Sequence, residues 1–374
     1  MKHFTAGYSQ NQGYYSSFQP NFINRKWLLD DMEIQQLLSK ADRQIGRLDM
    51  YSEYIPNIDM FISMHVLKEA TQSSKIEGTQ TNIEEALLDI EDIGFDKRDD
   101  WEEVQNYIEA MNNAIKKLEK LPFSSRLIKE THKTLLQGVR GKNKLPGDFR
   151  TSQNWIGGAS VADATFIPPI YSTINELMSD LEKFAHNEEF YMPDLLKIAL
   201  IHYQFETIHP FLDGNGRVGR LLITLYLVDK TILKKPILYL SDFFERNRQY
   251  YYDNLMNVRT KNDLKQWFKF FLVGIIETAK NGIATFDAVL KLKKEVEEKI
   301  QKNRSRTNHL LLIMEFLYQK PIVNANKIVE ITKVSQATAY KILDELEAME
   351  VLKEITGSKR GKTYMFDHYI KLFS

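Results

Sequence analysis

The sequence predicts a mainly α-helical protein with one short β-hairpin and a small C-terminal domain of a different kind. From Asp30 to Leu121, apolar residues recur three and four positions apart with few glycines, which indicates amphipathic helices. Residues 122–275 continue this pattern, apart from a glycine- and proline-rich stretch at Gly138–Pro169. The last 70 residues differ, because short helical segments are followed there by two strand-like segments.

The composition is that of an ordinary globular protein. The chain has 374 residues, of which 43% are hydrophobic and 27% charged, and this length allows two or three domains. Lysine plus arginine (50) equals aspartate plus glutamate (50), so no overall charge indicates a nucleic acid or membrane partner. The absence of cysteine excludes disulfides, thiolate metal sites and a cysteine nucleophile, and it suits a reducing compartment. With no signal-peptide pattern and no membrane-spanning apolar run, we expect a cytoplasmic protein without a membrane partner.

The first 25 or so residues are rich in Gln, Asn, Ser, Gly and Tyr and show no clear period. This composition predicts an extended arm rather than a regular element. Its aromatic residues suggest that the arm docks on another part of the protein; they are Phe4, Tyr8, Tyr14, Tyr15 and Phe18.

Two polar residues in the N-terminal helical region are spaced to lie on one helix face. Ser73 and Glu77 are four positions apart in the segment TQSSKIEG, and Gly78 is a plausible helix stop. By itself such a pair most often belongs to a solvated face.

The glycine- and proline-rich stretch is the place where strand chemistry is expected. Trp155 and Ile156 stand beside the paired glycines Gly157 and Gly158, and Ile167-Pro-Pro169 follows. This pattern predicts a short β-hairpin, with an ordinary surface loop as the alternative.

The segment HPFLDGNGRVGR, residues 209–220, is the most informative part of the chain. Its glycines leave backbone N–H groups open to an anion, and the apolar helical run at 221–228 would direct its positive end there. Arg217 and Arg220 are three apart, so on a helix both can bind phosphates. Asp213 is placed to hold a divalent cation, and His209 to accept a proton. The segment therefore predicts phosphate transfer.

The same segment also contains the spacing of a dinucleotide-binding fingerprint, at Gly214, Gly216 and Gly219. That motif requires a preceding β-strand and a βαβ context. Residues 194–207 have the pattern of an amphipathic helix instead, so the dinucleotide interpretation fails on context.

Residues 209–220 match HPFx(D/E)GNGRxxR, the signature of the Fic family, at every defined position. The chain thus resembles Fic proteins, which typically transfer the AMP part of ATP to a Ser, Thr or Tyr hydroxyl of a protein. The resemblance implies that His209 is the base, that Asp213 binds Mg²⁺, and that Phe211 anchors the loop. Gly214, Asn215 and Gly216 would form the anion hole, and Arg220 would lie nearest the terminal phosphate. The implied ATP-binding residues in this loop are Asp213, Gly214, Asn215, Gly216, Arg217, Val218, Gly219 and Arg220.

The resemblance also implies functions for two segments that precede the loop in the sequence. The predicted hairpin is similar to the Fic flap, which lies beside the nucleotide and pairs with the target peptide, so Ile156, Gly157 and Gly158 join the ATP-binding candidates. The segment containing Ser73 and Glu77 resembles the inhibitory motif (S/T)xxxE(G/N). That motif implies an ion pair from Glu77 to Arg220, which would deny the arginine to the γ-phosphate.

The aromatic segment FFERNRQYYY, residues 243–252, is the candidate adenine pocket. Similar Fic proteins carry an NR…YY segment here, so Asn247, Tyr251 and Tyr252 are the candidate residues. The alternative is that this tyrosine stripe serves only for packing within a helical protein.

The C-terminal region reads as helices at 310–317, 324–331 and 335–349, followed by strand-like segments at 351–355 and 362–366. This order resembles a winged helix domain, whose second helix often enters the DNA major groove. From residue 301 onward there are 12 Lys/Arg and 8 Asp/Glu, and three of the basic residues lie at the expected wing tip: Lys359, Arg360 and Lys362. The expected recognition helix turns acidic at Asp344, Glu345 and Glu347, so DNA binding and protein docking both stay open.

The resemblance divides the chain into four parts. These are an arm and helical region with the inhibitory motif (1–121), the Fic catalytic domain (122–278), a helical linker (279–304) and a winged helix domain (305–374). We expect a protein adenylyltransferase that uses MgATP, inhibited by Glu77, with an unknown target protein or the chain itself as acceptor. The alternatives are a DNA-binding regulator whose Fic part senses nucleotide, and a Fic enzyme that uses another donor or removes AMP. The apolar helices would also permit a homodimer.

Overall fold

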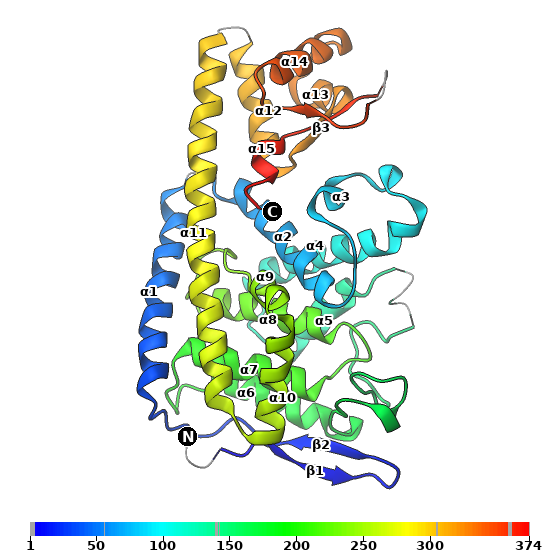
Figure 1. Cartoon of the computed structure of the whole chain (residues 1–374), viewed down its shortest axis with the longest axis vertical. Helices are drawn as coiled ribbons and strands as arrows, with labels where there is room; N and C mark the ends of the chain where they lie inside the picture. The colour runs from blue at the N-terminus through cyan, green and yellow to red at the C-terminus, as the bar shows by residue number, and fades with distance from the viewer. Residues whose placement is uncertain are drawn as a thin grey trace.

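The computed structural model describes residues 4–55, 57–138, 141, 143–303, 306–357 and 361–373. The protein is mainly helical, as the sequence predicts. A long helix, α11 (Leu264–Asn303), runs along the body, with the C-terminal region at one end and a small hairpin at the other (Figure 1). In the described part of the chain, no helix combines the length and apolar character needed to cross a membrane.

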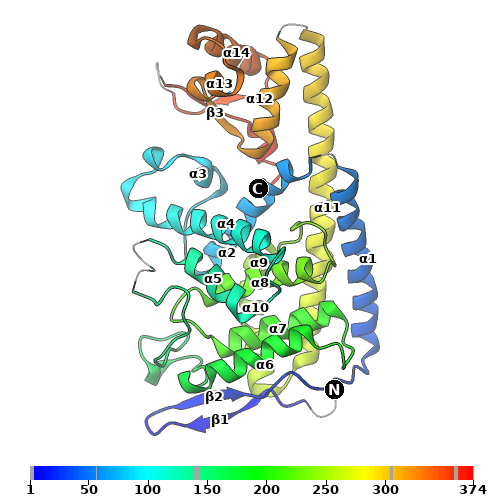
Figure 2. The same cartoon turned by 180° about the vertical axis from the view of Figure 1, so that it is seen from behind.

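Helix α1 (Met32–Tyr54) lies beside α11 in both views of the molecule (Figures 1 and 2). It begins at Asp31, whose side chain accepts hydrogen bonds from the first turn. Of the expected helical linker (279–304), residues 279–303 lie in the same continuous helix, α11, as residues 264–278. The reason is burial: Ala279, Phe286 and Val289 are completely buried, so apolar packing continues past the expected boundary.

Helices α7 (Asp194–Ile208) and α8 (Asn215–Asp229) form the centre of the fold. Every residue of α7 after Asp194 is buried, and a helix buried on all sides belongs in the middle of a bundle. The short connection between these two helices is therefore held by packed structure. The surrounding helices, some of which are seen from behind in Figure 2, are α2 (Asp59–Ile76), α4 (Arg98–Leu118), α5 (Ser125–Leu135), α6 (Ile174–His186), α9 (Ser241–Arg246) and α10 (Arg248–Lys261).

The N-terminal segment forms a β-hairpin, which corrects the expectation of an extended arm. Strands β1 (Gly7–Asn11) and β2 (Ser16–Pro20) pair antiparallel. The hairpin docks as its aromatic content suggests: the backbone N–H of Phe18 donates to Ile167 O at 2.9 Å, and the Phe18 ring lies 5.9 Å from that of Phe166. Both strands are mostly polar, so the sequence lacks the alternation of apolar and polar residues by which a strand is usually recognised.

The C-terminal region contains the helices and strands expected from its sequence, and its assignment as a winged helix domain stays a prediction. It packs against α2, because the Phe61 and Tyr318 rings lie 5.3 Å apart and Ser63 Oγ donates to Gln319 O at 3.0 Å. Two of the basic residues expected at the wing tip, Lys359 and Arg360, lie outside the described residues. The elements are α12 (Thr307–Gln319), α13 (Ala325–Thr332), α14 (Gln336–Ala348), α15 (Asp367–Ile370) and a sheet ordered β3 (Ile322–Asn324), β5 (Thr363–Met365), β4 (Lys353–Glu354).

Candidate active site

The connection from α7 to α8 is a tight loop that starts at His209. Helix α7 ends there because His209 adopts the left-handed conformation (φ 49°, ψ 60°). Gly214, also left-handed at φ 73°, precedes α8. The side chain of Asn215 closes the loop, since it accepts from Phe211 N–H and donates to Phe211 O, both at 2.8 Å. Asn215 thus shapes the loop with its side chain, and only its backbone is left for an anion hole.

His132 on α5 supports this loop, a residue that no sequence motif had indicated. Its ring stacks on Phe211 with centroids 3.7 Å apart. Its Nδ1 accepts from the N–H of Gly147, so Nε2 is the donor to Asp213 O at 3.0 Å. Burial lowers the pKa of His132 to about 4, which keeps the ring neutral in this role.

Arg150 and Asn154 tie the loop to the expected flap. The Arg150 side chain is 2% exposed and donates to His209 O at 3.0 Å, while its backbone N–H donates to Pro210 O at 2.9 Å. Asn154 Nδ2 donates to Phe211 O at 2.9 Å. These bonds satisfy the loop carbonyls and fix the flap base beside the loop.

The flap itself is smaller than the predicted hairpin. Ile156 and Phe166 exchange both backbone hydrogen bonds, at 2.8 and 3.1 Å, but form an isolated bridge. Gly157 and Gly158 both have positive φ, and a Cβ built at Gly157 would lie 2.4 Å from Thr165 Oγ1. The paired glycines therefore produce a looped tip instead of a second pair of strand residues.

The His209 ring is half-buried and neutral. Burial lowers its pKa to about 3, the positive charges of Arg259 and Arg150 add to this, and the Glu206 carbonyl acts in the opposite direction. At neutral pH the imidazole can therefore accept a proton. Arg259, which the sequence did not single out, donates to Glu206 O at 3.1 Å and lies 3.9 Å over the Phe166 ring.

Arg217 lies in the first turn of α8 and is 5% exposed. Its Nη1 pairs with Glu103 Oε2 of α4 at 2.9 Å, and its Nη2 is 3.9 Å from Asp213 Oδ1. Thr79 Oγ1 donates to the same oxygen of Glu103 at 3.2 Å. The Asp213 side chain is 45% exposed, so its carboxylate is open at the edge of the loop.

Arg220 is completely surrounded, and the expected ion pair with Glu77 is present. Its Nη2 lies 2.7 Å from Glu77 Oε1 and donates to Ser73 O at 2.9 Å, while its Nε donates to Ser73 Oγ at 2.9 Å. Burial by itself would lower the pKa of Arg220, but Glu77 together with Tyr251, Tyr252 and Glu206 outweighs this and raises the pKa.

The start of α8 is the open side of this arrangement. Among the residues that the structure describes, no side chain caps the helix, so its first N–H groups are available to an acceptor. The Glu77 carboxylate lies close by, because a Cβ built at Gly216 would be 2.2 Å from Glu77 Oε1. Two residues of the motif lie against the core of the fold, and their assignment to ATP stays a prediction. Val218 is completely buried, and a Cβ on Gly219 would be 2.2 Å from Glu206 Oε1 on α7.

The three candidate residues for the adenine pocket have different environments in the structure. Tyr251 is 1% exposed, its hydroxyl is bonded to His202 Nε2 at 2.8 Å, and its ring stacks on Phe244. It is a core residue, and its assignment to the nucleotide stays a prediction. Asn247 Nδ2 donates to Phe243 O, which shapes the join of α9 and α10. Tyr252 is 37% exposed and Asn247 is half-buried, so both remain accessible to a purine.

Comparison with known proteins identifies both helical regions. Residues 35–116 match the model of the Fic/DOC family N-terminal region, and residues 122–227 match that of the Fic/DOC family. A protein adenylyltransferase Fic of Culex quinquefasciatus is 33% identical over 125 residues, which are 33% of this chain and 22% of that protein. A probable protein adenylyltransferase of Aquifex aeolicus (strain VF5) is 38% identical over 90 residues, 24% of this chain and 26% of that protein.

Solved structures agree in fold. A Fic family protein from Desulfovibrio desulfuricans G20 has a TM-score of 0.54 at 18% identity, over 91% of this chain and 98% of that chain. A Fic domain containing signaling protein from Bacteroides thetaiotaomicron VPI-5482 has a TM-score of 0.52 at 18% identity, over 67% of this chain and 95% of that chain. The two matching family regions, the complete HPFLDGNGRVGR loop and the shared fold lead to one conclusion: the chain belongs to the Fic/DOC family.

Proposed function

We propose that this protein transfers AMP from MgATP to a Ser, Thr or Tyr hydroxyl of a target protein. The observation that carries this proposal is the neutral His209 imidazole at the end of α7, followed at once by an uncapped helix with Arg217 and Arg220 in its first turns. A base and an anion site in one loop are what transfer from a nucleotide requires. The names of the curated relatives support the same activity at the level of the family.

In the proposed reaction, His209 removes the proton of the target hydroxyl. The hydroxyl oxygen then forms a bond to the α-phosphorus of ATP, the bond from that phosphorus to the bridging oxygen breaks, and pyrophosphate leaves with the electron pair. Arg217, Arg220 and the N–H groups at the start of α8 neutralise negative charge on the phosphates.

Asp213 is the residue that would hold the magnesium ion. Its partly exposed carboxylate lies at the edge of the loop near Arg217, and Mg²⁺ prefers one or two carboxylates together with phosphate oxygens. The ion would supply charge neutralisation on the phosphates.

We further propose that Glu77 inhibits the enzyme from within the same chain. Its carboxylate binds Arg220 and lies against Gly216, so it stands where a phosphate would receive both the guanidinium and the N–H groups of the helix. A γ-phosphate and this carboxylate compete for the same donors. Release of Glu77 would then be required for productive ATP binding.

The test compares two labels on ATP. Transfer of AMP puts label on protein from α-labelled ATP and none from γ-labelled ATP, and mass spectrometry of the product gives the mass of an added AMP. Target proteins are supplied as a cell lysate together with the Glu77→Gly variant. Label from the γ-position on protein would instead indicate phosphoryl transfer and would contradict the proposal.

A further inference from the structure

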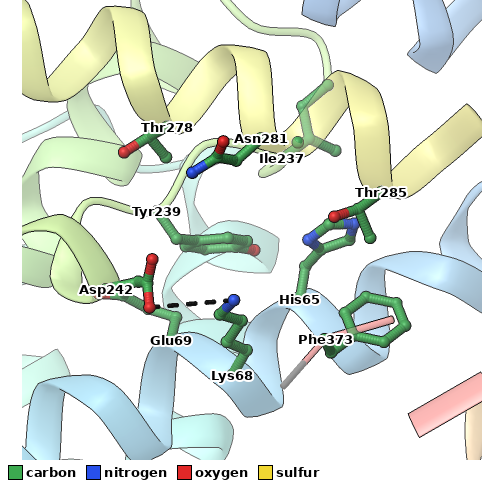
Figure 3. A pocket seen from close by; sticks show the side chains of 11 residues that line it. His65, Lys68, Glu69, Ile237, Tyr239, Asp242, Thr278, Asn281, Thr285 and Phe373 are labelled. Atoms are coloured by element: carbon green, nitrogen blue, oxygen red, sulfur yellow. Dashed lines mark ion pairs between the residues drawn. The ribbon is translucent and has the colours of Figure 1, made fainter. Parts of the chain in front are cut away.

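A second cleft lies on the part of α2 that precedes the inhibitory residues. There His65, Lys68 and Glu69 face the long helix α11, the segment that contains Tyr239, and Phe373, which follows α15 (Figure 3). The space between the lining residues is ≈ 500 Å³, with open solvent at the mouth included. The enclosed part is only ≈ 50 Å³, so a ligand would lie largely in the open mouth, and the cleft lies outside the HPFLDGNGRVGR loop.

His65 gives this cleft a polar group that lacks a partner. The side chain is 8% exposed, and within the described residues its Nε2 has no hydrogen-bond partner. Burial lowers the pKa of His65 to about 3, so the ring is neutral, and it packs against Phe286 and Phe373. A buried nitrogen without a partner is destabilising, and it indicates a place for a bound water or ligand.

The mouth of the cleft carries two opposite charges that bind each other weakly. Lys68 Nζ and Asp242 Oδ1 are 3.9 Å apart, which is too long for a hydrogen bond, and both side chains are more than a quarter exposed. Asp242 Oδ2 is held by Arg246 at 3.1 Å, so Lys68 Nζ and Asp242 Oδ1 are the charged atoms that a ligand could engage. On the α11 side, polar residues line the wall at helical spacing: Thr278, Asn281 and Thr285.

A buried chain of hydrogen bonds joins the cleft to the active site. Arg220 Nε donates to Ser73 Oγ at 2.9 Å, Ser73 is hydrogen-bonded to Tyr107, and Tyr107 donates to Glu69 Oε1 at 3.0 Å. Glu69 lines the cleft. His65, Glu69 and Ser73 also follow each other at intervals of four along α2, so they form one stripe of that helix, and Glu77 is the C-cap residue at its end.

We propose that this cleft binds a small zwitterion of the free α-amino acid type, and that its occupancy changes the strength of the Glu77–Arg220 pair. The ammonium group would pair with Asp242 and the carboxylate with Lys68, while His65 Nε2 gains a hydrogen bond and the aromatic walls contact the carbon skeleton. A phosphate ester would be repelled by the carboxylates of Asp242 and Glu69. A purely apolar molecule would leave His65 unpaired.

The effect on the active site rests on the proposed function, whereas binding in the cleft does not. A ligand that moves Glu69 alters the hydrogen bond that Glu69 accepts from Tyr107. Through Ser73, this change reaches the hydrogen bonds that hold the Arg220 guanidinium. Coupling of this kind is reciprocal, so the ligand and ATP must change each other's affinity by the same factor.

Binding is tested with the full chain and each of the standard amino acids in turn, by thermal shift and then by calorimetry. At least one should bind, and its affinity should fall about tenfold or more in Lys68→Met and in Asp242→Asn, since each removes one charge-assisted bond. Lys235→Met, which breaks an exposed ion pair with Asp59 elsewhere, serves as the control and should leave the affinity unchanged. No binding by any amino acid, or binding that both cleft variants leave intact, overturns the proposal.

Coupling is tested by measuring the affinity for ATP with and without the amino acid that binds. The affinity should change in the wild type, and Tyr107→Phe should retain amino acid binding but lose the change, because it removes only the linking hydroxyl. In Glu77→Gly, the amino acid should likewise no longer change the affinity for ATP. If the amino acid leaves the affinity of the wild type for ATP unchanged, the proposed coupling between the cleft and the active site is overturned. Both experiments measure binding and not AMP transfer. Their results can therefore be interpreted even if the protein does not transfer AMP.

Discussion

Glu77 Oε1 lies 2.7 Å from Arg220 Nη2 and would lie 2.2 Å from a Cβ on Gly216. One carboxylate thus covers both a guanidinium and the first turn of α8. A triphosphate that used these donors would have to displace it, and this requirement leads to the first two predictions.

Replacement of Glu77 by glycine should raise the affinity for ATP by roughly 10- to 100-fold. The reason is that a hydrogen bond between charged groups contributes about 1.5–3 kcal/mol, which the incoming phosphate no longer has to overcome. Calorimetry with ATP and Mg²⁺ measures the change, and AMP transfer should increase in parallel. Glu84→Gly, which removes an exposed carboxylate of the next helix, is the control and should behave as wild type. An unchanged affinity in Glu77→Gly would remove the support for inhibition.

Replacement of Ser73 by alanine should have a smaller effect in the same direction. The hydroxyl bond to Arg220 Nε is lost, but the Ser73 carbonyl and Glu77 still hold Nη2. The affinity for ATP should therefore rise by only a few-fold, about 1 kcal/mol for one hydrogen bond. If calorimetry gave an effect as large as that of Glu77→Gly, Ser73 and not the carboxylate would be the main restraint.

His209→Ala in the Glu77→Gly background should abolish AMP transfer while ATP binding persists. A general base contributes about 10²- to 10⁴-fold to a rate, and the arginines that bind phosphate are unaffected by the change. The rate of label transfer from α-labelled ATP and the calorimetric Kd are measured on the same samples. Transfer at more than about a tenth of the parent rate would mean that another group takes the proton.

Glu103→Gln should destabilise the protein without nucleotide more than with it. Arg217 is 5% exposed and pairs with Glu103 at 2.9 Å, so loss of the charge leaves a buried guanidinium poorly compensated, at a cost of about 1–3 kcal/mol. Phosphates that bind Arg217 would replace the missing negative charge. Urea unfolding with and without MgATP checks this, and Glu102→Gln, one position away, is the matched control. Equal destabilisation in both conditions would place the nucleotide away from Arg217.

The sequence predicted the site better than it predicted the surroundings of the site. The twelve residues of the loop are contiguous, so their chemistry could be recognised without knowing the fold. His132, Arg150, Glu103 and Arg259 come from four separate segments, and only packing brings them to the loop. No local pattern distinguishes such residues from ordinary helix or loop positions.

Two details of the structure could not be read from the local sequence, for a similar reason. Tyr251 and Tyr252 are neighbours in a tyrosine run, and only the helix orientation decides that the first is in the core and the second partly exposed. The N-terminal hairpin was missed because its strands are polar and its stability comes from contact with Phe166 and Ile167, far along the chain.

Acid should destabilise the protein below about pH 6.5, mainly through buried histidines. Burial lowers the pKa of His65, His202 and His209 to about 3, against 6.5 for the exposed side chain. Below pH 6.5 the unfolded chain therefore binds protons that the folded protein excludes, and the free energy of unfolding falls until the pH approaches 3. Glu206 acts oppositely, because burial raises its pKa to about 7 and the folded state gains a proton as the pH falls from 7 toward 4.5. Burial also lowers the pKa of His132 to about 4, which adds to the histidine effect. Burial raises the pKa of Glu69, Asp42 and Asp180, which act in the same direction as Glu206.

His202→Gln tests the assignment of this acid sensitivity. His202 bridges Gly219 O and the Tyr251 hydroxyl, and glutamine can form hydrogen bonds without titrating. Between pH 6 and pH 5 the variant should lose up to about 1.4 kcal/mol less stability per pH unit than wild type, the contribution of one proton. Urea unfolding across this range gives the slope, with His368→Gln on the exposed side of α15 as control. A slope identical to wild type would mean that His202 is protonated in the folded protein, and its bond to the Gly219 carbonyl would then have to outweigh the cost of burying its charge.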